Sequence, residues 1–349
     1  MVGWCRQGSV FDFIDGATNA ELEQDITSFK SFPEAVEYYF SYYREHGYPN
    51  YRLNDYNPQD ELEKLIAVKD EDIITNSEAK QVMTGCGYLW GYFPHWINVR
   101  PYSGGSLADN WGDDNKLRTL IEKNISWCVD HEGGRWSENR IRQNAKVYLS
   151  KQSPSNFRPT VAKALYNKFG DGGSVYDPCG GWGGRMFGFI ASGCKEYVCC
   201  EPSTQTVNGL NELSKAHRSV GKQITVNPIC QEDYTPEAEH FDMAFTSPPY
   251  YDCERYSEEE TQSYIRYKSL SKWVALFLEP LIYNAWVSLK WGGIFVLNIA
   301  NVKTASRLEE ESLILAEMVG FKHIDTIKLA LSSISGKGVK YEPMFVFKK

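Results

Sequence analysis

The 349-residue sequence contains no apolar run approaching the roughly 18 residues that a membrane-spanning helix needs, so we expect no transmembrane segment. Its first residues, MVGWCRQGSVFDFIDG, lack the basic and then apolar pattern of a secretory signal peptide. The nine cysteines form no C-x-x-C pair, and none of the six histidines pairs at a metal-ligand spacing, so no metal site is expected. These absences favour a cytoplasmic protein with free thiols.

The sequence also lacks internal repeats and low-complexity tracts. Hydrophobic residues make up 42% of the chain and aromatic residues 14%, which excludes a generally disordered protein. The length allows one large domain or two ordinary ones. Because the residue pattern changes near position 150, we expect an N-terminal region over residues 1–150 and a second domain over residues 151–349.

The N-terminal region contains two predicted helices. The first spans residues 31–47, with Ser31 and Pro33 at its start and Gly47 at its end. The second spans residues 57–69, with Asn57 as its cap and Pro58 at its first position. Residues 84–115 combine six glycines with many aromatics and suit no regular element. We therefore expect a long ordered loop there, of the kind that is typically functional.

From about Ser155 onward, short apolar runs alternate with helical patterns. A helix is predicted over residues 158–170, and others over 184–192, 203–219, 271–289 and 305–319. The apolar runs lie at residues 174–178, 196–202, 223–229, 241–250, 292–300, 321–329 and 344–349. This alternation predicts an α/β fold with a doubly wound, mostly parallel, Rossmann-like sheet. No helical pattern separates the last two runs, which predicts a C-terminal antiparallel hairpin added to that sheet.

Charge is distributed unevenly along the chain. The net charge is −8, and residues 1–80 hold 7 basic and 16 acidic side chains, a net of −9. Residues 135–168 hold eight basic side chains and one acidic one, Glu138, a net of +7. The eight are Arg135, Arg140, Arg142, Lys146, Lys151, Arg158, Lys163 and Lys168. Since phosphate binding depends on local potential, this stretch is a candidate nucleic-acid surface, and a solvated helix face is the alternative.

The first motif with chemical content is VYDPCGGWGGRMFG at residues 175–188, a strand that leads into a glycine-rich turn and a helix. Glycines at 180, 181, 183 and 184 let the backbone approach a ligand closely, although a plain tight turn is the alternative. Asp177 precedes the glycines, where a carboxylate could hold an amino group. Glu201 ends the next strand, where an acid can bind ribose hydroxyls. A nucleotide-like cofactor is expected at this turn, and the absence of G-x-x-x-x-G-K-[ST] excludes a P-loop.

The second motif, FDMAFTSPPYYDCERY, lies at the end of the fourth predicted strand. Pro248 and Pro249 stiffen the backbone and remove two N–H donors, while their carbonyls can still accept hydrogen bonds. Ser247 adds a hydroxyl, and Tyr250 offers a flat face on which a base can stack. Rigid acceptors beside an aromatic platform suit an exocyclic amino group.

Together these residues resemble the S-adenosylmethionine-dependent amino-methyltransferases of DNA, which methylate N4 of cytosine or N6 of adenine. DPCGGWGGR is similar to their cofactor loop, TSPPY to their catalytic motif, and NFRPTVAKAL to the segment near the methionine end of the cofactor. ICQEDY is similar to the segment that contacts adenine, and KYEPMFVFKK to the final hairpin. The resemblance covers residues 155–349. The cofactor residues it implies are Phe157, Arg158, Asp177, Cys179, Gly180, Gly181, Gly183, Glu201, Pro202, Glu232, Asp233 and Thr246.

The resemblance implies that the target base leaves the helix and stacks on Tyr250. It also implies that Ser247 and the carbonyl of Pro248 accept hydrogen bonds from the amino group of the base while its nitrogen attacks the methyl group in line. Pro249 completes the motif. Serine in TSPPY leans toward N4 of cytosine. Since only about 20 loop residues follow the motif before the next helix, target recognition is assigned to residues 1–150. The implied partner is DNA, as in a restriction-modification methyltransferase. The candidate nucleic-acid contacts are Arg140, Arg142, Lys146, Lys151, Arg255 and Arg266.

Other functions remain open on the sequence alone. Related S/N-P-P-Y motifs also serve N-methyltransferases of RNA and of protein amides. A cofactor-binding subunit without turnover is a further alternative, as is transfer of a larger group from a modified cofactor. Trp182, inside the glycine loop, either flanks the cofactor or packs against a neighbouring helix.

Overall fold

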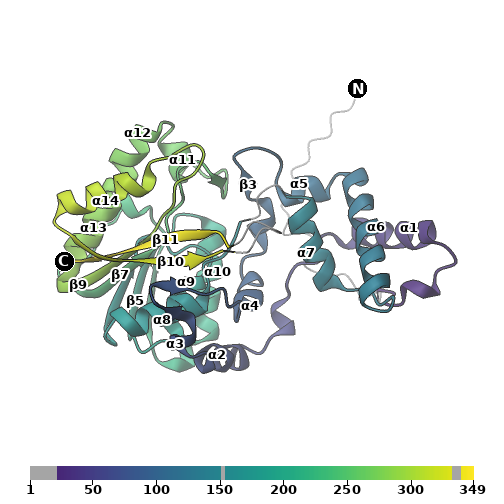
Figure 1. The fold of residues 1–349 in the computed structure, drawn as a ribbon, viewed down its shortest axis with the longest axis horizontal. Helices are drawn as coiled ribbons and strands as arrows, with labels where there is room; N and C mark the ends of the chain where they lie inside the picture. The colour runs from purple at the N-terminus through teal and green to yellow at the C-terminus, as the bar shows by residue number, and fades with distance from the viewer. Residues whose placement is uncertain (1–21, 151–153, 332–338) are drawn as a thin grey trace. The chain divides into compact units, whose positions relative to one another are not determined.

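The computed structural model describes residues 22–150, 154–331 and 339–349. The chain folds into two compact units (Figure 1). The first comprises Met1–Asn50 and Ser103–Ser153, and the second comprises Tyr51–Tyr102 and Pro154–Lys349. This division differs from the single boundary expected near residue 150, because residues 51–102 pack with the C-terminal part of the chain.

The second unit is built on a nine-stranded sheet with the order β1-β2-β10-β11-β9-β7-β4-β5-β6. Five strands at its centre and one edge are mutually parallel: β6 (Gln223–Asn227), β5 (Glu196–Cys200), β4 (Ser174–Asp177), β7 (Phe241–Thr246) and β9 (Leu289–Asn298). β11 (Tyr341–Lys348) pairs antiparallel with both β9 and β10 (Lys322–Ala330). The predicted Rossmann-like α/β class with a C-terminal antiparallel hairpin is therefore confirmed.

Both faces of the central strands β4, β5 and β7 are buried, as a doubly wound sheet requires. Successive residues alternate between the faces. On one face, Tyr166 of α8 packs against Phe245 and Phe189 of α9 packs against Tyr197. On the other face, Tyr176 belongs to a core cluster with Trp273, Phe277, Leu281 and Ile282. The helices are α8 (Pro159–Phe169), α9 (Gly184–Ile190), α10 (Thr204–Ala216), α11 (Ser263–Arg266), α12 (Leu270–Trp273), α13 (Glu279–Ser288) and α14 (Leu308–Val319).

The helix predicted over residues 271–289 is not one continuous α-helix. A π-helical turn, Val274–Leu278, separates α12 from α13. Pro280 lies in the first turn of α13 and has no N–H to donate, so the regular ladder of α-helical hydrogen bonds is interrupted there.

Residues 51–102 belong to the second unit because they complete its sheet and cover α8. The strands β1 (Ile74–Thr75) and β2 (Glu78–Ala79) extend the sheet beyond β10. Lys163 of α8 is 4% exposed, and its Nζ donates to the carbonyls of Ile66 and Val68 and pairs with Asp70 at 3.1 Å. The same segment contains α2 (Pro58–Ala67) and α3 (Asp70–Ile73), and Asn57 caps α2 as predicted.

The glycine- and aromatic-rich stretch 84–115 is more regular than expected. It contains α4 (Cys86–Trp90), a 3-10 turn Pro94–Asn98, β3 (Arg100–Pro101) and α5 (Leu107–Trp111). Gly85, with φ of +82°, precedes α4, and Ser106 forms a reciprocal capping box with Asp109 at the start of α5. The prediction of an irregular loop was wrong, and for α5 the missed signal is S-x-x-D, which marks the start of a helix.

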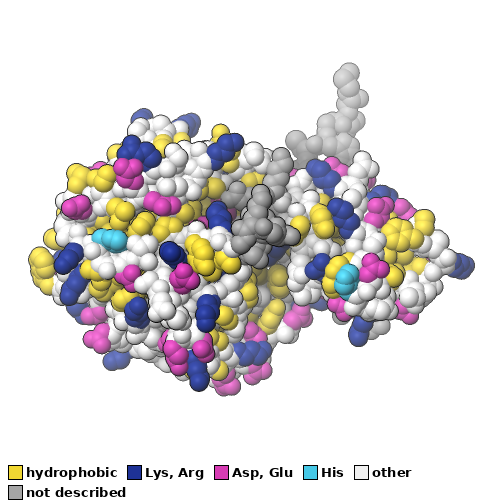
Figure 2. Space-filling view, in the orientation of Figure 1, with side chains coloured by type: hydrophobic (Ala, Val, Ile, Leu, Met, Phe, Trp, Pro, Cys, Tyr) yellow, Lys and Arg dark blue, Asp and Glu magenta, His cyan; other side chains and the backbone are white. Residues whose placement is uncertain are grey.

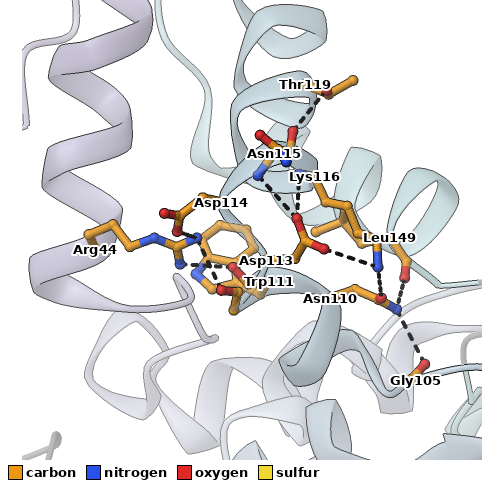
Figure 3. Close-up of polar contacts among 11 residues, drawn as sticks. Arg44, Gly105, Asn110, Trp111, Asp113, Asp114, Asn115, Lys116, Thr119 and Leu149 are labelled. Atoms are coloured by element: carbon orange, nitrogen blue, oxygen red, sulfur yellow. Dashed lines mark hydrogen bonds and ion pairs between the residues drawn. The ribbon is translucent and has the colours of Figure 1, made fainter.

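The first unit is helical, with α1 (Phe32–His46), α5, α6 (Asp114–His131) and α7 (Glu138–Tyr148). Tyr39 and Trp136 stack at 3.7 Å between ring centroids in its core, and Trp136 donates to the hydroxyl of Tyr43. Figure 3 shows the polar contacts at the α5–α6 corner. There Arg44 donates to the carbonyl of Trp111 and pairs with Asp114 at 2.7 Å. Asn110 donates to the carbonyl of Leu149, which joins this corner to the end of α7.

Candidate functional site

The two motifs meet at the point where the strand order of the sheet reverses. β4 and β7 are direct neighbours, with β5 and β6 on one side and β9 on the other. Ligands of open α/β sheets bind outside the carboxyl ends of strands at such a switch point. The backbone N–H of Cys179, in the glycine loop, lies 3.2 Å from Oγ1 of Thr246, the last residue of β7. This contact joins the glycine loop to the start of the SPPY segment.

Asp177 does not face the site. It is fully buried, with Arg185 Nε 2.8 Å from Oδ2 and the Tyr197 hydroxyl 2.6 Å from the same oxygen. Burial alone would lower the pKa of Arg185, but the charge of Asp177 outweighs it and the pKa is raised. Because Arg185 also donates to the carbonyl of Cys179, the pair fixes the loop from beneath. Asp177 therefore supports the glycine loop through Arg185, and the expectation that it holds an amino group of a ligand was wrong.

The four glycines of the loop have different surroundings. A Cβ at Gly180 would lie 3.1 Å from Cys199 Sγ, and one at Gly183, with φ of +70°, would lie 2.8 Å from Leu213. At Gly181, with φ of +58°, a Cβ would meet no atom closer than 3.7 Å. Gly180 and Gly183 thus serve close packing within the chain, while Gly181 is the glycine that leaves room for a ligand.

Glu201 lies at the carboxyl end of β5, as the sequence predicted, and the structure places it beside Gly181. Its Oε2 accepts from the N–H of Gly181 at 3.0 Å, and its Oε1 accepts from the N–H of Ser203, beyond Pro202, at 2.9 Å. Burial raises the pKa of Glu201 to about 7, although these hydrogen bonds act in the opposite direction. A carboxylate offers about four lone-pair positions, so Glu201 can still accept bonds from hydroxyl groups.

Glu232 and Asp233, the predicted adenine contacts, are already paired. Glu232 accepts from Arg266 at 2.8 Å and from the Tyr267 hydroxyl at 3.0 Å, and burial raises its pKa. Both carboxylate oxygens of Asp233 accept from Arg266, at 2.8 and 3.1 Å. The charge of Arg266 is neutralised by these two acids, which contradicts its expected contact with a phosphate. Both carboxylates are in turn paired with Arg266.

The SPPY segment is held by residues of β9 and β11. Ser247 Oγ lies 3.1 Å from Asn298 Oδ1, while the Tyr250 hydroxyl lies 3.4 Å from the carbonyl of Asn298 and 3.4 Å from Glu342 Oε2. Burial, followed by the charge of Glu342, raises the pKa of Tyr250 well above its usual value. Pro248 is buried and Pro249 half-buried. Sequence reasoning missed Asn298 and Glu342, although Asn298 is a polar residue inside the predicted run 292–300 and Glu342 stands just before the run 344–349.

Residues 156–158 pass directly over the glycine loop. Asn156 Nδ2 donates to the carbonyl of Trp182 at 2.6 Å, and the ring of Phe157 packs edge-on against Phe245. Arg158 is 8% exposed, and its guanidinium has no hydrogen bond or ion pair with any other described residue. Burial lowers the pKa of Arg158, and Glu342 acts in the opposite direction without forming an ion pair. An unpaired buried guanidinium is costly unless an anion neutralises it.

Trp182 packs against other aromatic side chains, which is one of the two alternatives that the sequence left open. It is 8% exposed and contacts the rings of Trp90, His95 and Tyr256 within 6.5 Å between centroids. The rest of this aromatic cluster comes from the 51–102 segment and from the loop after SPPY. The glycine loop is therefore supported by both segments.

The basic stretch 135–168 comprises cations of several kinds. It is divided between the two units, and its described cations have different surroundings. Arg142 donates to the carbonyl of Pro49 at 2.6 Å and pairs with Glu138. Its partners are thus within the protein, and the expectation that it contacts a nucleic acid was wrong. Arg140 lies over the ring of Trp127 at 4.0 Å, and Lys146 is half-buried on the same helix. Lys151 lies outside the described residues.

Arg255 is the exposed cation nearest to the SPPY segment in sequence, with its guanidinium 5.6 Å from the centre of the Tyr264 ring. On the face shown in Figure 2, lysines and arginines are interspersed with acidic side chains and are not gathered into one patch. Among residues 22–150, 154–331 and 339–349, no cluster of three or more His, Cys, Asp or Glu could hold a metal ion. No described helix is both long and apolar enough to cross a membrane.

No family model matches the chain, and no curated protein matches it either. Solved structures with a similar fold include geranyl diphosphate methyltransferase in complex with SAM, at 12% identity and a TM-score of 0.40 over 60% of this chain and 90% of that one. A SAM-dependent O-methyltransferase from Thermotoga maritima has 11% identity and a TM-score of 0.36, over 59% and 70%. The [4+2]-cyclase SpnF has 15% identity and a TM-score of 0.35, and the match spans 48% of this chain and 59% of SpnF. Likenesses this remote leave the chemistry of this chain to its own residues.

Proposed function

We propose that this chain transfers a methyl group from S-adenosylmethionine to the exocyclic amino group of a DNA base, N4 of cytosine or N6 of adenine. The observation that carries the proposal is the junction at the carboxyl ends of β4 and β7. There a glycine loop with ligand room at Gly181 is hydrogen-bonded to the strand that leads into Ser247-Pro248-Pro249-Tyr250. A cofactor loop and a rigid set of acceptors are thereby joined at one sheet edge.

The residues around the glycine loop fit this cofactor chemically. Gly181 leaves backbone room, and Glu201 has acceptor capacity for ribose hydroxyls. The buried guanidinium of Arg158, which has no hydrogen bond or ion pair with any described residue, suits the carboxylate of the methionine end. When bound, S-adenosylmethionine would supply an electrophilic methyl group. The amine nitrogen would form the new bond to the methyl carbon, S-adenosylhomocysteine would leave with the electron pair of the broken methyl–sulfur bond, and the methylated nitrogen would lose one proton to solvent. Asp177 and Arg185 support the loop from its buried side and are not expected to touch the ligand.

The SPPY segment acts on the amine. An exocyclic amino nitrogen is a poor nucleophile because its lone pair is delocalised into the ring. Ser247 Oγ and the carbonyl of Pro248 accept its two N–H bonds, which draws the nitrogen toward a tetrahedral geometry and localises the lone pair. The face of Tyr250 stacks on the base, which contributes about 1–3 kcal/mol toward the cost of extracting it from the helix.

Replacing Arg158 by methionine is expected to weaken S-adenosylmethionine binding by about 10- to 100-fold, the value of a charge-assisted hydrogen bond. The same change should leave the free energy of unfolding equal or increased, because it removes a buried charge that has no partner among the described residues while keeping the apolar volume. Isothermal titration calorimetry and chemical denaturation measure the two quantities. Arg218→Met, at an exposed arginine of the same unit, is the control. Unchanged cofactor affinity in Arg158→Met would remove Arg158 from the site.

The experiment that tests the function is transfer of labelled methyl groups from S-adenosylmethionine to unmodified DNA, with RNA and protein incubated in parallel. Nucleoside mass spectrometry of the digests identifies the product. N4-methylcytosine or N6-methyladenine in DNA would support the proposal and identify the base. Label only in RNA or protein, or none despite measurable cofactor binding, would overturn it.

A further inference from the structure

We propose that Asn298 is a positioning residue that turns the Ser247 hydroxyl away from the amine, so that the serine oxygen can act only as a hydrogen-bond acceptor. The inference rests on the function proposed above. It deepens that function by stating how a hydroxyl, which can donate as well as accept, is confined to one role.

The orientation of the Asn298 amide follows from its partners. Its Nδ2 lies 3.0 Å from the carbonyl oxygen of Pro343, which can only accept a hydrogen bond. The NH2 group must therefore face Pro343, and Oδ1 must face Ser247. Since Oδ1 is also only an acceptor, the Ser247 hydroxyl, 3.1 Å away, must donate to it. Ser247 also shares a side-chain hydrogen bond with Tyr250. Since its own hydrogen is committed to Asn298, Ser247 Oγ can only accept from the Tyr250 hydroxyl, and its second lone pair remains for an incoming N–H.

Asn298 is well placed to impose this constraint. It is 2% exposed and is the last residue of β9, which pairs with β7 on one side and β11 on the other. In the register, Leu297 lies opposite Thr246, and Asn298 lies opposite Met344. Asn298 also touches Tyr250, but through its main-chain carbonyl, which any residue at this position would retain. A side-chain substitution to alanine therefore removes the contacts with Ser247 and with the carbonyl of Pro343, and leaves the Tyr250 contact in place.

The chemical consequence concerns the nucleophile. A freely rotating serine hydroxyl could donate to the lone pair of the amine and so occupy the electron pair that must attack the methyl group. With its hydrogen committed to Asn298, Ser247 can only accept an N–H of the amine, which favours the reactive geometry. Asn298 itself need not touch the substrate, and its effect passes through Ser247.

The test compares Asn298→Ala and Asn298→Asp with the wild type at saturating cofactor and acceptor. Asn298→Ala is expected to lower kcat by about 100-fold, with little change in KM. In Asn298→Asp, an ionised carboxylate would place an acceptor oxygen against the carbonyl oxygen of Pro343, which is unfavourable because neither can donate. The protonated acid can donate to the carbonyl of Pro343 and accept from Ser247, as asparagine does. The kcat of this variant is therefore expected to rise relative to the wild type as the pH is lowered. Asn167→Ala, whose amide bonds Asp70 and Gly193 before the start of β5, is the control.

A double-mutant cycle with Ser247→Ala separates positioning from a general structural role. If Asn298 acts through Ser247, adding Asn298→Ala to Ser247→Ala should cause almost no further loss of kcat. The same cycle in unfolding free energy tests the hydrogen bond without cofactor or substrate. Wild-type kcat in Asn298→Ala, or full additivity on kcat, would overturn the proposal. The two proposals can also fail separately. If the wild-type protein methylates no amine but the unfolding cycle shows coupling, the proposed function is overturned, and with it the positioning role of Asn298 in the reaction. The hydrogen bond between Asn298 and Ser247 would still stand.

Discussion

Replacing Ser247 by alanine is expected to lower the rate of methyl transfer by at least about 100-fold, while S-adenosylmethionine binds with nearly unchanged affinity. The hydroxyl is one of only two acceptors proposed for the amine, the other being the carbonyl of Pro248. The residues proposed to hold the cofactor, among them Glu201 and Arg158, have no hydrogen bond to Ser247 in the described structure. Single-turnover transfer and calorimetric cofactor binding, measured on the same preparation, check both parts.

Ser312→Ala is the matched control for this substitution. The Ser312 hydroxyl is also buried, but it donates to the carbonyl of Leu308 within α14 and touches neither motif. Removing it should leave transfer unchanged. Ser247→Ala is expected to cost about 1 kcal/mol of stability, because Asn298 Oδ1 loses its donor. A Ser247→Ala protein with the transfer rate of the wild type would show that the SPPY hydroxyl has no part in the reaction.

Replacing Gly184 by alanine is expected to lower the free energy of unfolding by about 3 kcal/mol. Helix propensity alone predicts the opposite sign, since alanine is favoured over glycine by about 1 kcal/mol within a helix. A Cβ at Gly184, however, would lie 1.9 Å from the carbonyl oxygen of Phe157 and 2.7 Å from Asn156 Oδ1. The first of these is backbone, so residues 156–158 would have to move off the loop. Cofactor affinity should fall as well, because Arg158 belongs to that segment.

Gly193→Ala distinguishes this steric effect from a general effect of the substitution. A Cβ at Gly193 would meet nothing closer than Asn167 Oδ1 at 3.7 Å, an ordinary contact, and its φ is not in the left-handed region. Its free energy of unfolding should change by no more than about 0.5 kcal/mol. Denaturant titration of both variants gives the comparison. Equal stability of the two would mean that Phe157 does not cross the loop at Gly184.

Local sequence signals predicted much of this protein. Ser31 and Asn57 begin their helices as expected, since their side chains accept from backbone N–H groups within the first turn. The alternation of apolar runs and helices led to the sheet and to its C-terminal hairpin. The two motifs were expected at one sheet edge, because the carboxyl ends of parallel strands lie together. Each of these inferences depends on residues close together in the chain.

The state of the charged residues could not be predicted in the same way. Asp177 was expected to hold an amino group of a ligand but is bonded to Arg185, and Arg266 was expected on a phosphate but is paired with Asp233. Lys163 was counted in a basic stretch, yet it is buried against carbonyls about 95 residues away, such as that of Val68. A count of charges along the sequence cannot tell a solvated cation from one whose partner comes from another segment.

The sequence by itself determined the class of the fold, the position of the glycine loop and the identity of the SPPY segment, because helix caps, strand periodicity and glycine turns are set by neighbouring residues. Only the tertiary structure decided which polar groups of those motifs are committed to the protein and which are left for a ligand. Packing assigns Asp177 to Arg185 and the hydrogen of Ser247 to Asn298, while it leaves Arg158 without a partner among the described residues. Hydrogen bonds and ion pairs depend on distances of about 3 Å, and such distances between remote segments exist only once the sheet has formed.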